Sequence, residues 1–176
     1  MVALVSRTGR HLQRYNKGSR QVVGCIPYRY KGTKKSSSVV EEELEVLVIS
    51  SQNKAKGMLF PKGGWETDES IIDAAQRETM EEAGVSGVVE CELGKWNFKS
   101  RRNDVFYEGY MFQLLVKEQR EIWPEKDIRQ RKWLSVTEAR KACQHGWMKE
   151  ALDVFVRRIT SSQRHEDEEI GPCSLC

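Results

Sequence analysis

The sequence of 176 residues contains no long uncharged apolar run. A helix that crosses a bilayer needs about 18 or more such residues in succession. The first residues also lack the apolar core of a secretory signal. We therefore expect a protein without a transmembrane segment that is not secreted. With 39% hydrophobic residues and no internal repeat, the length predicts one compact domain.

Cysteine is also scarce, with five residues in the whole chain. An odd number in a domain of ordinary size favours reduced intracellular thiols over a disulfide framework. Cys173 and Cys176 form the only close pair, and a structural zinc ion needs four ligands, so we expect no zinc site. Cys173 is fourth from the end and loosely matches a prenylation site, but the residues after it are atypical and we expect an unmodified tail.

Acidic residues are absent from positions 1–40, which carry nine of the 29 Lys and Arg residues. The other positions carry 20 basic and 26 acidic residues. Three interpretations stay open: a mitochondrial transit segment over 1–15, a phosphate-binding edge of an active site, and a solvated basic arm. We therefore expect a mitochondrial or cytoplasmic protein. A presequence that is removed on import could not also line the site.

Local patterns predict most of the regular elements. Runs rich in β-branched and aromatic residues predict strands at 20–30, 44–50, 88–99, 105–117 and 132–135. Helical patterns fall at 66–85, 137–144 and 147–159. The basic turn 100–104 joins two of the strands into a hairpin. Strands before and after one central helix predict an α/β (α+β) fold, a mixed sheet sandwiched between helices.

Three regions follow along the chain. We expect a basic arm or transit segment at 1–19, a folded domain at 20–160, and a polar, disordered tail at 161–176. The central helix is the best marked element, because Thr67 or Asp68 can cap its start and Gly84 can end it. One of its stripes is small or β-branched and is expected to pack on the sheet: Ile72, Ala75, Thr79 and Ala83.

A cluster of acids marks another face of this helix. With about 3.6 residues per turn, Glu78, Glu81 and Glu82 share an arc of roughly 100°. Like charges one turn apart destabilise a helix, and a hard divalent cation removes that repulsion. Mg²⁺ and Mn²⁺ take oxygen ligands and usually keep sites for water or phosphate oxygens. The pattern therefore predicts a Mg²⁺ or Mn²⁺ site that handles a phosphorylated substrate.

Neighbouring residues suit such a site. Arg77 can pair with Glu81 across one helical turn and so orient a metal ligand. Gly63 and Gly64 lie just upstream, where the lack of a side chain lets main-chain groups approach a metal or a phosphate.

These residues together resemble the Nudix box. Gly63 is followed after five residues by Glu69, and after seven more by the run RETMEEAGV at 77–85, in which only Thr79 departs from the family pattern. The flanking LFPKGGWE at 59–66 and the later WPE and RKW segments are similar to a plant branch of the family, itself similar to the diphosphoinositol polyphosphate phosphohydrolases. The resemblance implies a Nudix hydrolase with an α/β/α sandwich that hydrolyses a phosphoanhydride bond in a nucleoside diphosphate derivative or a related diphosphate.

The expected roles follow from this resemblance and the helix geometry. Glu78 and Glu82 hold the metal with help from Glu81, Arg77 orients the acids, and the general base is Glu82 or, as second choice, Glu81. Nine basic groups could form a substrate pocket together with Gly63 and Gly64: Arg10, Lys17, Arg20, Lys62, Lys99, Arg101, Arg102, Arg129 and Arg131. Such a pocket suits a polyphosphate.

The substrate stays open between three classes: diphosphoinositol polyphosphates, dinucleoside polyphosphates and ADP-ribose-like compounds. A nucleoside would need an apolar slot, for which Trp65, Trp96 and Tyr107 are candidates, although core packing is the expected job of each. No SQPW stretch follows the box, which disfavours NADH. The alternative function is a catalytically idle domain that senses a phosphorylated ligand or RNA.

Overall fold

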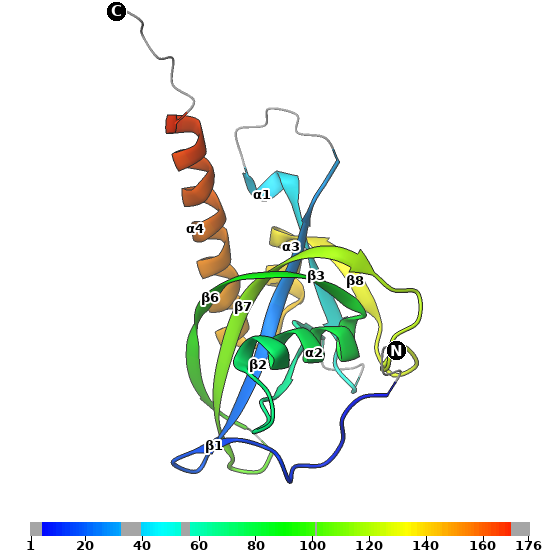
Figure 1. Ribbon diagram of the computed structural model, residues 1–176. Helices are drawn as coiled ribbons and strands as arrows, with labels where there is room; N and C mark the ends of the chain where they lie inside the picture. Colours follow the sequence, from blue (N-terminus) through cyan, green and yellow to red (C-terminus); the bar gives the residue numbers. More distant parts are fainter. Residues whose placement is uncertain (1–4, 33–39, 54–56, 101, 170–176) are drawn as a thin grey trace, which may run out of the picture.

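The computed structural model describes residues 5–32, 40–53, 57–100 and 102–169 (Figure 1). One mixed sheet runs through the middle of the molecule. Its strands are β1 (Tyr15–Asn16), β2 (Ser19–Tyr30), β3 (Leu44–Ser50), β4 (Met58–Leu59), β5 (Lys62–Gly64), β6 (Val85–Lys99), β7 (Phe106–Gln119) and β8 (Arg131–Ser135). The helices of the protein are α1 (Val40–Glu43), α2 (Ile71–Ala83), α3 (Val136–Ala142) and α4 (Gly146–Glu169).

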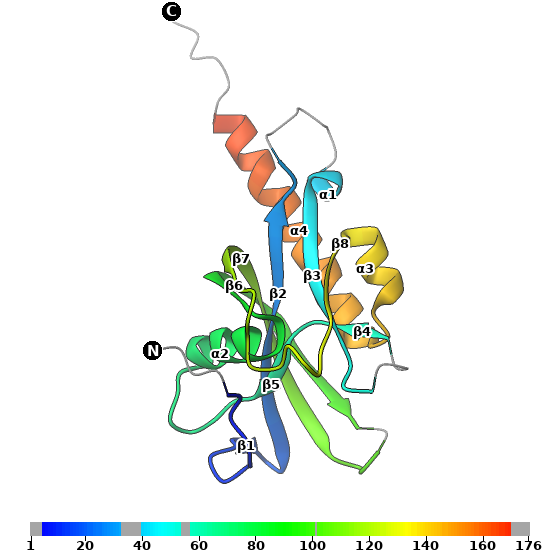
Figure 2. The same ribbon diagram turned by 90° about the vertical axis from the view of Figure 1, so that its right-hand side faces the viewer.

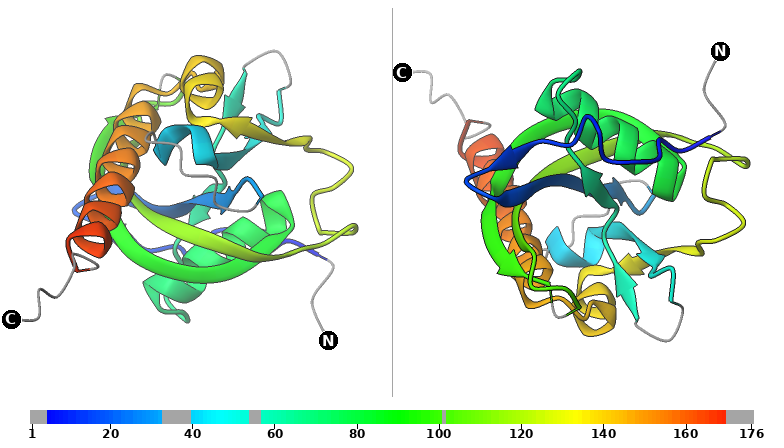
Figure 3. Two further views of the ribbon diagram at one scale, coloured as in Figure 1. Left: turned by 90° about the horizontal axis from the view of Figure 1, so that it is seen from above. Right: turned by 90° about the horizontal axis from the view of Figure 1, so that it is seen from below.

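Strand β2 organises this sheet. The main strand order is β4-β3-β2-β7-β6, with β1 and β5 also paired to β2 and β8 paired to β3. Among the pairings between the described strands, only β2–β7 is parallel. All five predicted strands and the β6–β7 hairpin are present. The sheet is covered by α2 on one face and by α3 and α4 on the other (Figures 2 and 3), which confirms the expected sandwich.

Each face has its own core. On the α2 face, the small side chains of Ala74 and Ala75 are fully buried against Val23 and Leu114 of the central strands. On the other face, larger side chains such as Phe155 of α4 and Met111 of β7 fill the space. Small residues let α2 lie close to β2 and β7. The sheet therefore fixes the position of the α2 backbone.

The start of α2 differs from the expectation. The helix begins at Ile71, and Ser70 rather than Thr67 or Asp68 caps it by accepting a hydrogen bond from the Asp73 N–H at 3.1 Å. The preceding residues are held in a turn, because the Thr67 N–H donates to the Leu12 carbonyl at 2.7 Å. Tertiary contacts thus override a local capping preference.

The remainder of α2 is close to the expectation. Gly84 ends the helix with φ 68°, the left-handed conformation that glycine adopts without strain. Strand β6 starts directly after it at Val85, three residues earlier than predicted. The packing stripe was wrong at Ile72, whose surface is 38% exposed, while Ala75 and Ala83 are fully buried as expected and Ala74 is buried with them. Thr79 is fully buried as expected.

The described parts of both terminal segments contribute to the fold. The segment before β2 is part of the fold, since Arg14 N–H donates to the Trp65 carbonyl at 2.9 Å and β1 pairs with β2. Helix α4 continues through residues 161–169, which were expected to be disordered. Gln, Arg and Glu favour helix, so an established helix extends through this polar segment. The C-terminal cysteines lie outside the described residues. None of the described helices is long and apolar enough to cross a membrane.

Candidate active site

The acidic face of α2 is buried. Glu78, Glu81 and Glu82 are only 8%, 8% and 7% exposed, because β5 and the loop that follows β7 cover this side of the helix. Charged residues are almost never buried to this degree unless they are paired. Each carboxylate does have partners, and these partners define the site.

Arg77 connects the acids to the turn before the helix. Its guanidinium donates to Glu78 Oε1 at 2.8 Å, to Glu81 Oε2 at 3.3 Å and to both oxygens of Glu69 at 2.7 and 2.9 Å. The expected Arg77–Glu81 pair is therefore present. A further bond to the Gly64 carbonyl at 2.8 Å ties the helix to β5. Although burial opposes its charge, the surrounding carboxylates raise the pKa of Arg77, so it stays a cation.

Arg129 holds Glu82 from the opposite side. Its NH2 group donates to Glu82 Oε1 at 2.6 Å, its Nε donates to Glu125 Oε2 at 2.6 Å, and its NH1 donates to the Ser50 carbonyl at 3.0 Å. The Lys62 main-chain N–H donates to Glu82 Oε2 at 2.9 Å. Both oxygens of Glu82 are thus fixed. Arg129 was expected only among the substrate cations, and no local sequence pattern indicated this pairing.

The two glycines of β5 make close approaches. A Cβ at Gly63 would overlap the Glu78 carboxylate, so this acid can occupy its position only because residue 63 has no side chain. A Cβ at Gly64 would overlap Gln13 Oε1 and lie 3.0 Å from an Arg20 nitrogen. The expected role of both glycines, to let main-chain groups approach a metal or a phosphate, stays a prediction.

Burial shifts the titration of these acids. Desolvation raises the pKa of Glu78 to about 8 against the lowering effect of Arg77, and it raises the pKa of Glu82 to about 7 against Arg129 and Lys62. Desolvation also raises the pKa of Glu81, against the Arg7 N–H and Arg77. Burial thus disfavours the ionised form of all three acids, and the neighbouring cations offset this only in part.

The carboxylates of the cluster also outnumber the cations that pair with them. Within the described residues, five carboxylates (Glu69, Glu78, Glu81, Glu82 and Glu125) share two guanidiniums, those of Arg77 and Arg129. No three His, Cys, Asp or Glu side chains in the described part of the chain already converge as a metal-binding group. The donor set, all oxygen and short of positive charge, nevertheless fits a hard divalent cation.

An N-terminal segment also reaches the cluster. The Arg7 main-chain N–H donates to Glu81 Oε1 at 3.2 Å. The Arg7 side chain pairs with Glu66 and, at 3.0 Å, with Asp68, and Ser6 Oγ donates to Glu125 at 3.3 Å. These contacts join residues more than 50 positions apart, so sequence reasoning missed them.

The expected substrate cations are not all gathered. Arg20 lies at the site, where its Nε donates to Gln13 Oε1 at 2.9 Å, and Lys62 reaches it through its main chain. Arg131 instead covers the end of α2, donating to the Ala83 carbonyl at 3.1 Å and stacking on Trp123 at 3.9 Å. Four other expected substrate cations are exposed: Arg10, Lys17, Lys99 and Arg102. Arg101 lies outside the described residues.

The candidate aromatic residues pack within the protein. Tyr107 stacks on Phe98 at 5.1 Å between centroids, and Phe98 stacks on Trp147 at 4.7 Å. Trp65 lies against Tyr110 and under Arg14, and Trp96 Nε1 donates to Glu150 at 2.8 Å. Each ring therefore already has partners, as expected for core packing.

A large cavity of about 930 Å³ lies beside Arg129. Its charged lining is basic apart from Glu138, whose carboxylate caps α3: Lys126, Arg129, Arg131, Lys132 and Lys141. Within the described residues, no carboxylate forms an ion pair with any of the three lysines. This cavity borders the acid cluster, because Arg129 contacts both.

Comparison with known proteins identifies the family. The NUDIX domain model matches residues 33–155. Nudix hydrolase 18, mitochondrial, from Arabidopsis thaliana is 62% identical and covers 99% of both chains. The NUDIX domain of Shewanella oneidensis NrtR, complexed with ADP ribose, has a TM-score of 0.63 at 16% identity, covering 82% of this chain and 90% of that one. A C. elegans Ap4A hydrolase has a TM-score of 0.59 at 18% identity, covering 80% and 98%. The chain belongs to the Nudix hydrolase family.

Proposed function

We propose that the protein is a Mg²⁺- or Mn²⁺-dependent pyrophosphohydrolase that cleaves a phosphoanhydride bond at the acidic face of α2. The observation that carries this is the excess of buried carboxylates over guanidiniums around Glu78, Glu81 and Glu82. A folding role would be better served by neutral residues, because burying unpaired charge costs free energy. A divalent cation would offset that cost.

Each side chain has a proposed role. Glu78 and Glu82, assisted by Glu81, would hold the ion, which when bound neutralises the diphosphate and lowers the pKa of water. Arg77 keeps Glu78 and Glu81 oriented. We propose Glu82 as the general base and Glu81 as the alternative. Glu82 is held rigidly by Arg129 and the Lys62 N–H, and burial keeps its pKa near 7, which suits proton transfer at neutral pH.

For the substrate, we propose a diphosphoinositol polyphosphate. The cavity beside Arg129 presents three unpaired lysines, which suits many phosphates on one small molecule. The candidate rings for holding a base each pack on another aromatic ring: Trp65 on Tyr110, Trp96 on Trp147 and Tyr107 on Phe98. Dinucleoside polyphosphates and ADP-ribose-like compounds are the alternatives, since the structural neighbours include an Ap4A hydrolase and a domain complexed with ADP ribose.

For the location, we propose mitochondria, because the similar Arabidopsis protein is named mitochondrial. The segment from Val5 onward would then stay on the mature enzyme. Arg7 and Arg14 contact α2 and the turn before it, so they serve the fold as well as carrying positive charge. Cell fractionation tests the location, and absence from mitochondria would contradict it. N-terminal sequencing of the mitochondrial protein tests the retention of the segment, and a start beyond Val5 would contradict it.

The function is tested with purified protein, Mg²⁺ or Mn²⁺, and a panel of the three substrate classes. We expect phosphate release that requires the metal and is fastest with the diphosphoinositol polyphosphate. Glu78→Gln should abolish turnover, while Glu92→Gln, at an exposed position on β6, should not. Tight binding of the panel or of RNA without any turnover would instead indicate the idle sensor domain.

A further inference from the structure

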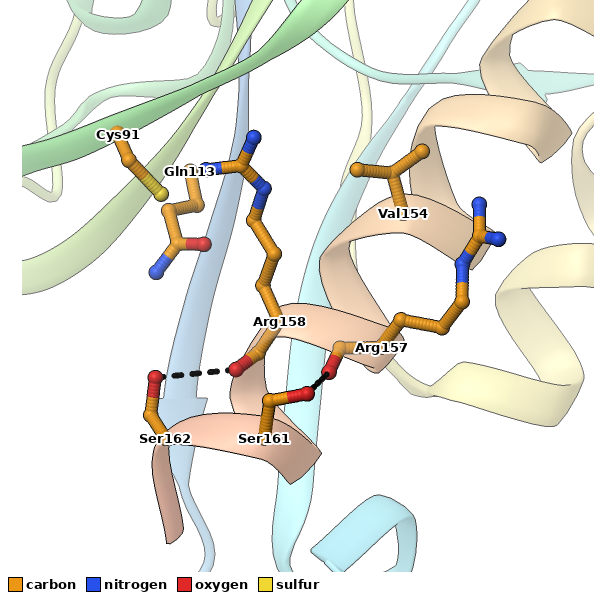
Figure 4. A pocket seen from close by; sticks show the side chains of 7 residues that line it. All are labelled: Cys91, Gln113, Val154, Arg157, Arg158, Ser161 and Ser162. Carbon is orange, nitrogen blue, oxygen red and sulfur yellow. Dashed lines mark hydrogen bonds between the residues drawn. The ribbon is translucent and has the colours of Figure 1, made fainter. Parts of the chain in front are cut away.

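A second cavity lies on the other side of the sheet from α2. It has a volume of about 390 Å³ and is formed by α4, β6 and β7. Its lining combines apolar surface with polar and charged groups: Cys91, Gln113, Val154, Arg157, Arg158, Ser161 and Ser162 (Figure 4). This volume falls within the range of about 300–1,000 Å³ that is typical of small-molecule sites. The acid cluster of α2 contributes no residue to it.

Gln113 leaves one polar atom without a partner. The residue is only 6% exposed, its Nε2 donates to Glu90 Oε1 at 3.0 Å, and its buried Oε1 has no hydrogen-bond partner. An ionised carboxylate only accepts hydrogen bonds. Turning the Gln113 amide round would place its oxygen against the Glu90 oxygen, so the amide keeps the orientation described. A buried carbonyl oxygen without a donor costs free energy. This cavity therefore offers a fixed acceptor for a ligand O–H or N–H.

The two serines add further acceptors. Ser161 Oγ donates to the Arg157 carbonyl at 2.9 Å, and Ser162 Oγ donates to the Arg158 carbonyl at 3.0 Å. Their hydrogens are thus used within α4, and their remaining lone pairs can accept. The polar groups other than the arginines therefore favour a ligand that carries several hydroxyl groups.

The two arginines supply the charge. Within the described residues, neither Arg157 nor Arg158 forms an ion pair with a carboxylate. The Arg158 side chain extends from α4 toward Gln113, so a cation and the unpartnered oxygen face the same space (Figure 4). The Arg157 side chain extends away from Arg158 (Figure 4), so Arg158 is the guanidinium that can bind a phosphate bidentately beside Gln113.

We propose that this cavity binds a phosphorylated polyol that carries a single phosphate, at a site separate from the catalytic one. The phosphate binds to Arg158, and the hydroxyl groups donate to Gln113 Oε1 and to the serine oxygens. The proposal does not depend on the function assigned to α2, because the two sites share no residue and lie on opposite faces of the sheet (Figure 3).

Glucose 6-phosphate serves as the test ligand, with EDTA present so that no divalent ion bridges it to the acids of α2. Isothermal titration should show saturable 1:1 binding, and glucose or inorganic phosphate alone should bind at least about tenfold more weakly, since each loses contacts worth roughly 1.4 kcal/mol or more. Equal binding of inorganic phosphate would refute the polyol assignment. A lack of glucose 6-phosphate binding would overturn the site.

Matched variants locate the binding. Arg158→Ala should weaken it by about tenfold or more, whereas Arg164→Ala, at an exposed position further along α4, should not. Gln113→Met should reduce the preference for glucose 6-phosphate over inorganic phosphate, and unchanged turnover would show that this variant is folded. Glu78→Gln should bind as the wild type does. Binding lost in Glu78→Gln but kept in Arg158→Ala would place the ligand at α2 and refute the proposal.

Discussion

Arg129 and Glu82 form a buried ion pair, 2.6 Å from nitrogen to oxygen, between residues 47 positions apart in the chain. The pair links α2 to the loop before β8. Because Arg129 also binds Glu125 and the Ser50 carbonyl, it is the only side chain among those described that connects Glu82 to both β3 and that loop.

Arg129→Leu should therefore destabilise the protein strongly. It leaves two carboxylates without their cation, and breaking a buried ion pair typically costs about 3–5 kcal/mol. Arg140→Leu is the matched control, since its pair with Asp153 is exposed and such pairs contribute about 1 kcal/mol or less. Urea unfolding of both variants measures the difference. Equal losses would show that the Arg129 contacts add little to stability.

Glu82→Gln should reduce kcat by about 10²–10⁴-fold with little change in fold, as expected for loss of a general base. The amide keeps the size of the side chain but cannot take a proton. Glu81→Gln should have a smaller effect, and circular dichroism checks the fold of each. Should Glu81→Gln prove the more damaging of the two, the base would be Glu81.

Gly63→Ala should impair both metal binding and turnover. Its methyl group would overlap the Glu78 carboxylate and force that side chain or β5 to move. Gly146→Ala provides the comparison, because nothing lies within 4 Å of a Cβ there. Metal titration and kcat are the measurements, and the idea fails if the two alanine variants behave alike.

Without metal, stability should fall as the pH rises from about 5 to 8. The folded pKa values of about 8 for Glu78 and about 7 for Glu82 exceed the ordinary value of 4.5, so the folded state binds these protons more tightly. Their contribution is complete below pH 4.5 and is lost as the pH passes the folded pKa. Melting temperatures in EDTA measure this. Glu78→Gln should flatten the profile, and an unchanged slope would contradict the assignment.

Substrate affinity should depend on the lysines beside Arg129. Replacing Lys132 and Lys141 by Ala should raise KM for a diphosphoinositol polyphosphate by about tenfold or more while kcat changes little, since these groups are proposed to bind phosphates remote from the reaction. Lys117→Ala with Lys149→Ala is the control of equal charge at positions outside this cavity. Similar KM values in both double variants would count against this binding mode.

Local sequence patterns predicted the acidic face of α2 well, because helical periodicity alone places Glu78, Glu81 and Glu82 on one arc. They failed where distant segments decide. Thr67 and Ser70 are both good caps, and the contact of Thr67 with Leu12 selects Ser70. Arg131 has the same charge as Arg129, yet only the fold turns one toward Glu82 and the other toward the end of α2. The partners of the basic residues were therefore harder to predict than the shared face of the three glutamates.

The bond from the Arg7 main chain to Glu81 has a consequence for mutagenesis. Every amino acid except proline supplies the same N–H, so an alanine scan would leave this bond in place and report only the loss of the side-chain pairs with Glu66 and Asp68. Comparing Arg7→Pro with Arg7→Ala would separate the two contributions. The identity of residue 7 can thus vary widely while its backbone still contacts Glu81.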